Sequence, residues 1–168
     1  MKKVVGQLSV EARGEREIVF TREFNAPRAL VFEAHSKPEH VQRWLLGPSG
    51  WTMPVCEIDF RERGRYRYVW RHADGREMAM GGIFREIVAP ERIVTTELFD
   101  KDWTGGEAVT TIVLTERGSK TVMVNTVVYA TREGRDGALA TPMADGMETS
   151  YARLDELVAS LSPGAATA

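Results

Sequence analysis

The side chains that could carry acid–base chemistry are few in this sequence of 168 residues, and they are widely spaced. Glu57 and Asp59 stand two positions apart in a predicted strand, so both carboxylates lie on one face of it. In an apolar pocket, one member of such a pair would have a raised pKa and could act as a general acid. Alternatively, both face solvent and pair with Arg65, Arg67 or Arg71 of the next strand, and we favour this second interpretation. We therefore assign no catalytic residue.

Metal binding and nucleophilic catalysis lack the residue patterns that they require. His35, His40 and His72 do not have the four-residue spacing of a helical metal-binding pair, so we predict no metal site. Cys56 is the only cysteine and lies in an apolar run, which indicates a buried thiol and excludes an internal disulfide. The sequence contains no nucleophile elbow, phosphate-binding loop or dinucleotide fingerprint, and we predict no cofactor.

Aromatic and methionine side chains form the clearest candidate binding surface. Tyr66, Tyr68 and Trp70 occupy alternate positions of a predicted strand over 65–72 and share one face. Met78 and Met80 repeat this alternation on the strand that follows a tight turn. Such a face is either part of a packed core or the wall of a hollow that accepts an apolar guest. We predict a wall, because a curved sheet held against one long helix tends to leave a hollow between them. Flexible methionines around such a hollow would tolerate guests of several shapes.

Periodicity and turn signals predict one α+β domain over residues 15–161, which must position these side chains. A strand over 15–24 precedes two short helices, the first beginning near Pro27 and the second ending at Gly47. From Trp51 onward the pattern is typical of strands joined by short links. The sequence thus predicts an antiparallel meander of about seven strands.

A long amphipathic helix is predicted over 136–161. Its apolar residues recur at helical spacing: Met143, Met147, Tyr151, Leu154, Val158 and Leu161. Pro142 is either the start of the helix, with Thr141 as its cap, or a kink in a longer helix, and we favour the kink. Outside the domain we predict a flexible N-terminal segment over 1–14 and a flexible tail over 162–168.

Four segments, in this order, resemble one known family. They are REFNAPRALVFEAHSKPEHVQRWLLGP, EIDFRERGRYRY, ADGREMAMGGIFREIVAPERIV and GMETSYARLDEL, which together cover most of the chain from Thr21 to Leu161. The chain is similar to the START-like (SRPBCC) helix-grip superfamily, which includes birch-pollen-allergen-like proteins and polyketide cyclases. Within this superfamily, the sequence of these segments resembles the branch homologous to the activator of heat-shock-protein-90 ATPase. Arg63 departs from this pattern, since relatives often have a glycine there, and many relatives carry a tryptophan near Tyr151.

The resemblance implies a curved sheet around the C-terminal helix, with the usual ligand cavity between them. We accordingly predict binding of a small, mostly apolar molecule, without evident catalytic machinery. The predicted ligand-binding residues are Trp44, Tyr66, Tyr68, Trp70, Met78, Met80, Trp103, Met143, Met147 and Tyr151. Trp44 and Trp103 lie at an element end and in a loop, where they either form the cavity mouth or pin these segments to the body.

Two other functions stay open at this point. An arginine-rich sheet face, Arg61, Arg63, Arg65, Arg67 and Arg71, could dock a chaperone or another acidic protein, as an activator-type interaction module would. Acidic residues nearby favour a solvated face of mixed charge instead. A cyclase- or hydratase-like enzyme would require a polar group that projects into the apolar cavity.

Composition limits the remaining partners. The net charge is −2, with 22 Lys and Arg against 24 Asp and Glu, which argues against a dedicated nucleic-acid binder. Neither a bilayer-spanning apolar run nor a secretion signal is evident, so we expect a cytoplasmic protein that does not insert into membranes. The oligomeric state is left open, and a homodimer is compatible with the sequence.

Overall fold

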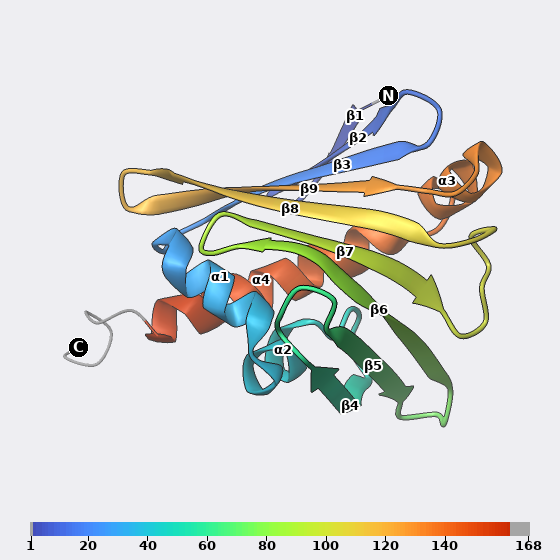
Figure 1. Cartoon of the computed structure of the whole chain (residues 1–168), viewed down its shortest axis with the longest axis horizontal. Coiled ribbons are helices and arrows are strands. Elements are labelled where there is room, and N and C mark those ends of the chain that lie inside the picture. Colours follow the sequence, from blue (N-terminus) through green and yellow to red (C-terminus); the bar gives the residue numbers. More distant parts are fainter. Residues whose placement is uncertain (1, 162–168) are drawn as a thin grey trace.

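One antiparallel sheet dominates the computed structural model, which describes residues 2–161 (Figure 1). Across these residues the sheet has nine strands in the order β1-β2-β3-β9-β8-β7-β6-β5-β4. The strands are β1 (Lys2–Val5), β2 (Leu8–Arg13), β3 (Glu17–Phe24), β4 (Trp51–Ile58), β5 (Arg65–His72), β6 (Glu77–Val88), β7 (Arg92–Phe99), β8 (Ala108–Arg117) and β9 (Lys120–Val128). The helices are α1 (Arg28–Ser36), α2 (Pro38–Trp44), α3 (Arg132–Leu139) and α4 (Met143–Leu161).

The connections between these elements confirm the predicted α+β helix-grip architecture. Strands β4 to β9 follow one another as a meander, and β3 pairs with β9 along its whole length. Helices α1 and α2 carry the chain from β3 to β4 at the far edge of the sheet, and they lie with α4 on one of its faces (Figure 1). None of the described helices is long and apolar enough to cross a membrane.

Two strands were not expected from the sequence, which accounts for nine strands instead of about seven. Residues 2–13 fall in the predicted flexible segment, yet they form the hairpin β1–β2, and β2 pairs with β3. Leu8 and Val10 alternate on β2 and are almost fully buried, so this short hairpin extends the core. The predicted tail over 162–168 lies outside the described residues.

The C-terminal region also differs from the predicted single kinked helix. Helix α3 begins at Arg132, four residues before the predicted start, and the break at residues 140–142 separates it from α4. The Thr131 hydroxyl caps α3 by accepting a hydrogen bond from the Gly134 amide at 2.9 Å. Pro142 has no N–H to continue the helix, and the Thr141 hydroxyl donates to the Ala138 carbonyl at 2.7 Å. The chain therefore ends one helix and starts another.

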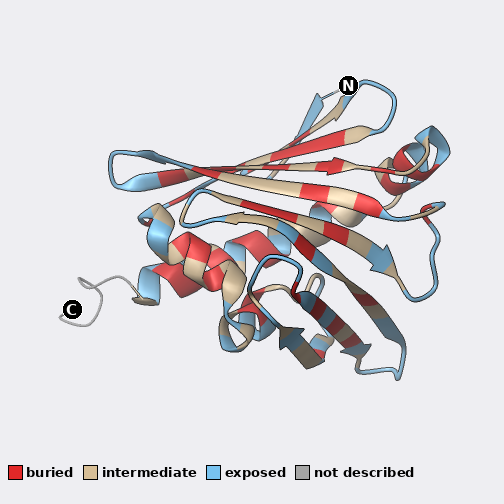
Figure 2. Cartoon of the chain, in the orientation of Figure 1, coloured by how far each residue is buried: buried red, intermediate tan, exposed pale blue. Residues whose placement is uncertain are grey.

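The core lies between α4 and the inner face of the sheet, where buried positions alternate along the strands (Figure 2). Phe20 and Phe24 of β3 are fully buried there, as are Leu154 and Val158 of α4. Arg22 stands between the two phenylalanines, and only 1% of its side chain is exposed. It forms ion pairs with two acidic residues of α4, which attach the helix to the sheet.

Candidate functional site

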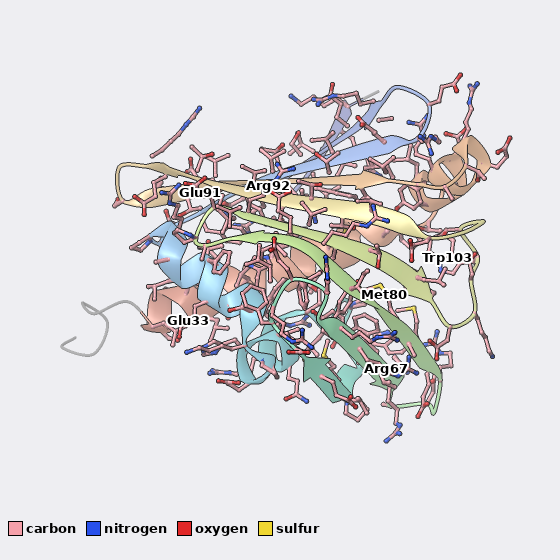
Figure 3. The ribbon with its side chains drawn as sticks, in the orientation of Figure 1. Glu33, Arg67, Met80, Glu91, Arg92 and Trp103 are labelled. Atoms are coloured by element: carbon pink, nitrogen blue, oxygen red, sulfur yellow. The ribbon has the colours of Figure 1, made fainter. Side chains whose placement is uncertain are left out.

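A cavity of about 540 Å³ lies between the inner face of the sheet and helices α2 and α4. This volume is within the range of about 300–1,000 Å³ that small-molecule sites occupy. Met78 and Trp103 are 41% and 49% exposed, so they lie at the mouth. Trp103 belongs to the loop after β7, and Met80 lines the wall from β6 (Figure 3).

All ten side chains that the sequence predicted as ligand-binding line this cavity. Strand alternation explains this for β5 and β6, because Tyr66, Tyr68 and Trp70 project to the same side as Met80. The three rings form a contiguous row, with ring centroids 5.0 Å and 5.7 Å apart. In fact all four tryptophans and all four tyrosines of the chain line the cavity. Whether these residues bind a ligand stays a prediction.

Trp44 belongs to the wall and not to the mouth. It is only 3% exposed, and its indole N–H donates to the Ala34 carbonyl at 2.9 Å. Its ring stacks on Tyr151 of α4 at a centroid distance of 5.9 Å. Trp70 is fixed in a similar way, since its N–H donates to the Leu45 carbonyl at 2.7 Å. These indoles connect α1, α2, α4 and β5 around the cavity.

Glu97 is the polar group of the cavity that sequence reasoning missed. It lies on β7 in phase with Ile93, Thr95 and Phe99, which also line the wall. The Thr110 hydroxyl donates to the Glu97 carboxylate at 3.2 Å. Burial raises the pKa of Glu97 above its ordinary value, because the apolar surroundings disfavour the charged form.

The acidic candidates chosen from the sequence lie elsewhere. Glu57 is exposed, and Asp59 pairs on the outside with Arg61 at 2.9 Å. His72 is half-buried, and its Nδ1 atom is 3.1 Å from the Asp74 carboxylate. None of the three lines the cavity. The interpretation of Glu57 and Asp59 as solvent-facing is therefore correct, although Asp59 pairs with Arg61 and not with the next strand.

Asn125 and His35 add further polar atoms to the wall. The Asn125 amide donates to the Tyr151 hydroxyl at 3.2 Å, and its buried Oδ1 atom has no partner within residues 2–161. The His35 ring packs against Trp44, and its Nδ1 atom lies 2.8 Å from the Val31 carbonyl oxygen. Burial lowers the pKa of His35, so the neutral ring donates from Nδ1 and leaves Nε2 as an acceptor.

The tyrosine hydroxyls stay protonated and act only as hydrogen-bonding groups. Burial, and to a smaller extent the Glu97 charge, raises the pKa of all four hydroxyls, to about 12 for Tyr151. Across the described chain, no three His, Cys, Asp or Glu side chains gather closely enough to hold a metal ion. The site is thus an aromatic cavity with one carboxyl group and a few neutral polar atoms.

A sheet that curves over a long helix and encloses such a cavity defines a helix-grip domain. The sequence profile of the family described as "Activator of Hsp90 ATPase homolog 1-like protein" matches residues 25–159, and the chain belongs to this family. None of the curated proteins matches the chain.

Solved structures agree with this assignment. A crystal structure of a protein from Rhodobacter sphaeroides is similar with a TM-score of 0.85 and 30% identity, over 91% of this chain and 99% of that one. A protein from Chromobacterium violaceum has a TM-score of 0.74 and 27% identity, over 85% and 96% of the two chains. An AHSA1-like protein from Aeromonas hydrophila, at 17% identity, shares the fold with a TM-score of 0.65 over 85% and 93%. Fold and family are therefore established, and both are consistent with ligand binding or with an activator-type module.

Proposed function

We propose that this protein binds a small, mostly apolar molecule in the cavity between the sheet and α4. The observation that carries the proposal is the cavity of about 540 Å³ that every tryptophan and tyrosine of the chain lines, at the wall or at the mouth. Burial of apolar surface would provide most of the affinity, at about 25 cal/mol per Å². The few polar atoms of the wall would orient the guest.

The two alternative functions have weaker support. Three arginines of the arginine-rich sheet face already form ion pairs. Arg67, labelled in Figure 3, lies 2.7 Å from Asp100. Arg71 lies 2.7 Å from Glu77, and Arg61 pairs with Asp59. These pairs neutralise much of the charge that an acidic partner protein would need. For a cyclase- or hydratase-like enzyme, Glu97 supplies the required polar group. The described residues that line the cavity include no second acidic side chain to share acid–base work with it.

Titration with a series of linear alcohols of eight to fourteen carbons tests the proposal. Because all four tryptophans line the cavity, a bound alcohol should change their fluorescence and raise the melting temperature. The proposal fails if no alcohol in the series produces either change.

A pair of variants locates the binding. Thr95→Phe adds a ring to the wall of the cavity, whereas Thr111→Phe makes the same change on β8 at a position that alternates with the cavity-lining Thr110 and Ile112. We expect Thr95→Phe to weaken binding at least about tenfold, a loss of about 1.4 kcal/mol, and Thr111→Phe to leave it unchanged. Equal binding by both variants would place the alcohol outside the cavity.

A further inference from the structure

We propose that the natural ligand carries a basic nitrogen on its apolar body, and that the Glu97 carboxylate binds this nitrogen. The inference rests on the proposed function, since it concerns the same cavity. It adds the chemical class of the ligand: a hydrophobic amine, and neither a fatty acid nor a neutral hydrocarbon.

The charge of the cavity wall is the first argument. Glu97 is the only acidic residue among the described residues that line the cavity, and this set contains no lysine or arginine. The lining histidine, His35, is neutral because burial lowers its pKa. Glu97 is half-buried. A partly desolvated carboxylate without a counter-charge is unfavourable, and a ligand ammonium group would supply that counter-charge. A ligand carboxylate would instead be repelled.

The balance of hydrogen-bonding groups is the second argument. Several donors of the wall are already used within the protein: the Thr110 hydroxyl by Glu97, and the Tyr66 hydroxyl by the Thr96 carbonyl at 2.6 Å. The indole N–H groups of Trp44 and Trp70 are likewise bonded to main-chain carbonyls.

Several acceptors of the wall are open. The Glu97 carboxylate accepts one bond from Thr110, although its two oxygens can accept several. The Asn125 Oδ1 atom has no partner among residues 2–161, and His35 presents Nε2 as an acceptor. The remaining tyrosine hydroxyls can either donate or accept. A wall with spare acceptors suits a ligand that brings donors, and an ammonium group brings three or fewer N–H groups and no acceptor.

The aromatic rings are the third argument, because the faces of tryptophan and tyrosine attract cations. The Glu97 carboxylate is close enough to all four tyrosines for its charge to raise their pKa values. The rings of Tyr66, Tyr68 and Trp70 form a row along β5 at the same wall. A cation bound at Glu97 would therefore also lie among electron-rich rings.

Three probes with the same ten-carbon chain separate the head groups: decylamine, decanol and decanoic acid, each titrated below its micelle concentration at pH 7.5. An alkylamine has a pKa of about 10, as lysine does, and is charged at this pH. We expect wild-type protein to bind decylamine at least about tenfold more tightly than decanol, a difference of about 1.4 kcal/mol. Decanoic acid should bind more weakly than decanol. Binding is measured by tryptophan fluorescence and by calorimetry.

Three variants assign the preference to Glu97. Glu97→Gln keeps the shape but removes the charge, so decylamine should lose its advantage over decanol. Glu97→Asp keeps the charge and should keep a preference for the amine. Glu57→Gln removes one carboxylate from an exposed position outside the cavity and should behave as wild type. Circular dichroism and melting temperature verify that each variant is folded.

The outcomes separate this inference from the proposed function. If decanol binds but decylamine has no advantage, or if the advantage survives in Glu97→Gln, the amine inference is overturned and the proposed function stands. If none of the three probes binds to wild-type protein, both are overturned. Tightest binding of decanoic acid would also reject the inference, because it would require a cationic group in the wall.

Discussion

Replacement of Arg22 by methionine should show how strongly the sheet holds α4. The Arg22 side chain is 1% exposed, and its guanidinium lies 3.0 Å from Glu148 and 3.5 Å from Asp155. It also donates to the Glu23 carbonyl at 2.9 Å. Methionine would fill much of the same space without the charge and without these hydrogen bonds.

The expected loss follows from the burial of the three partners. Removal of one member of a fully buried ion pair costs about 3–5 kcal/mol, because the remaining charge is left without a partner. Glu148 and Asp155 are 15% and 20% exposed, so water can partly solvate them after the change. We therefore expect about 3 kcal/mol, which corresponds to a decrease of roughly 6–12 °C in melting temperature for a chain of this size.

Urea unfolding followed by circular dichroism measures this loss, and two further variants test its cause. Lys120→Met removes a cation whose ion pair with Glu23 is about half exposed, and it should cost less than about 1 kcal/mol. The combination of Arg22→Met with Glu148→Gln and Asp155→Asn removes both stranded charges and should recover most of the loss. A loss for Arg22→Met no larger than that of Lys120→Met would refute the reasoning, as would a triple variant no more stable than the single one.

Three other changes test the site and the sheet. Burial raises the pKa of Glu97 in the folded state, so the folded protein holds a proton that the unfolded chain releases. The stability that this proton contributes is fully present below the ordinary pKa of 4.5, and it is lost as the pH rises from that value through the raised pKa. Glu97→Gln should therefore be more stable than wild type at pH 8, by about 1.4 kcal/mol for each unit of pKa difference. This advantage should shrink towards pH 4. Urea unfolding at both pH values measures it, and a difference that does not change with pH would contradict the reasoning. Gly82→Ala should destabilise the protein by about 1–3 kcal/mol, because the added Cβ would lie 2.0 Å from the Thr96 carbonyl oxygen. Gly137→Ala in α3 places its Cβ in open space and should stabilise the protein by up to about 1 kcal/mol in the same assay. Burial raises the pKa of the half-buried Cys56 thiol to about 11, so a thiol reagent at pH 8 should react at least about tenfold more slowly with folded than with urea-unfolded protein, and equal rates would show an accessible thiolate.

The sequence predicts most of this fold because its strands and its last helix have strong periodicity. The alternation of Tyr66, Tyr68 and Trp70 was sufficient to place them on one wall of the cavity. The hairpin β1–β2 was not predicted, because its apolar pattern is short and consists of two almost fully buried residues, Leu8 and Val10. Its burial depends on the strand β3 beside it and on α4, which local periodicity does not describe.

The break before α4 could not be decided from the sequence for a similar reason. A proline in a helical pattern can produce a kink or an end, and neighbouring helices decide which. Here Arg135 of α3 donates to the Gly14 carbonyl in the turn after β2 at 3.2 Å and to the Glu17 carbonyl at the start of β3 at 3.0 Å. These bonds attach α3 to the sheet and separate it from α4. The predicted start at residue 136 thus missed the first turn of a distinct helix.

Glu97 and Arg22 show which part of the site a sequence can reveal. Arg22 stands in phase with the apolar residues of β3, and a shift of one residue would turn them outward, so its charge is forced to the inner face. A charged residue in such a phase therefore predicts a buried charge. Glu97 stands in phase with Ile93 and Phe99, but Val94 and Leu98 occupy the other phase of β7, so alternation alone does not fix its side. What differs is the partner: Arg22 pairs with Glu148 and Asp155 of α4, whereas the one partner of the Glu97 carboxylate within residues 2–161 is the neutral Thr110 hydroxyl. The first charge is neutralised by the fold and stabilises it. The second is left without a counter-charge in the cavity wall, and this is the property that makes Glu97 a site for a ligand cation.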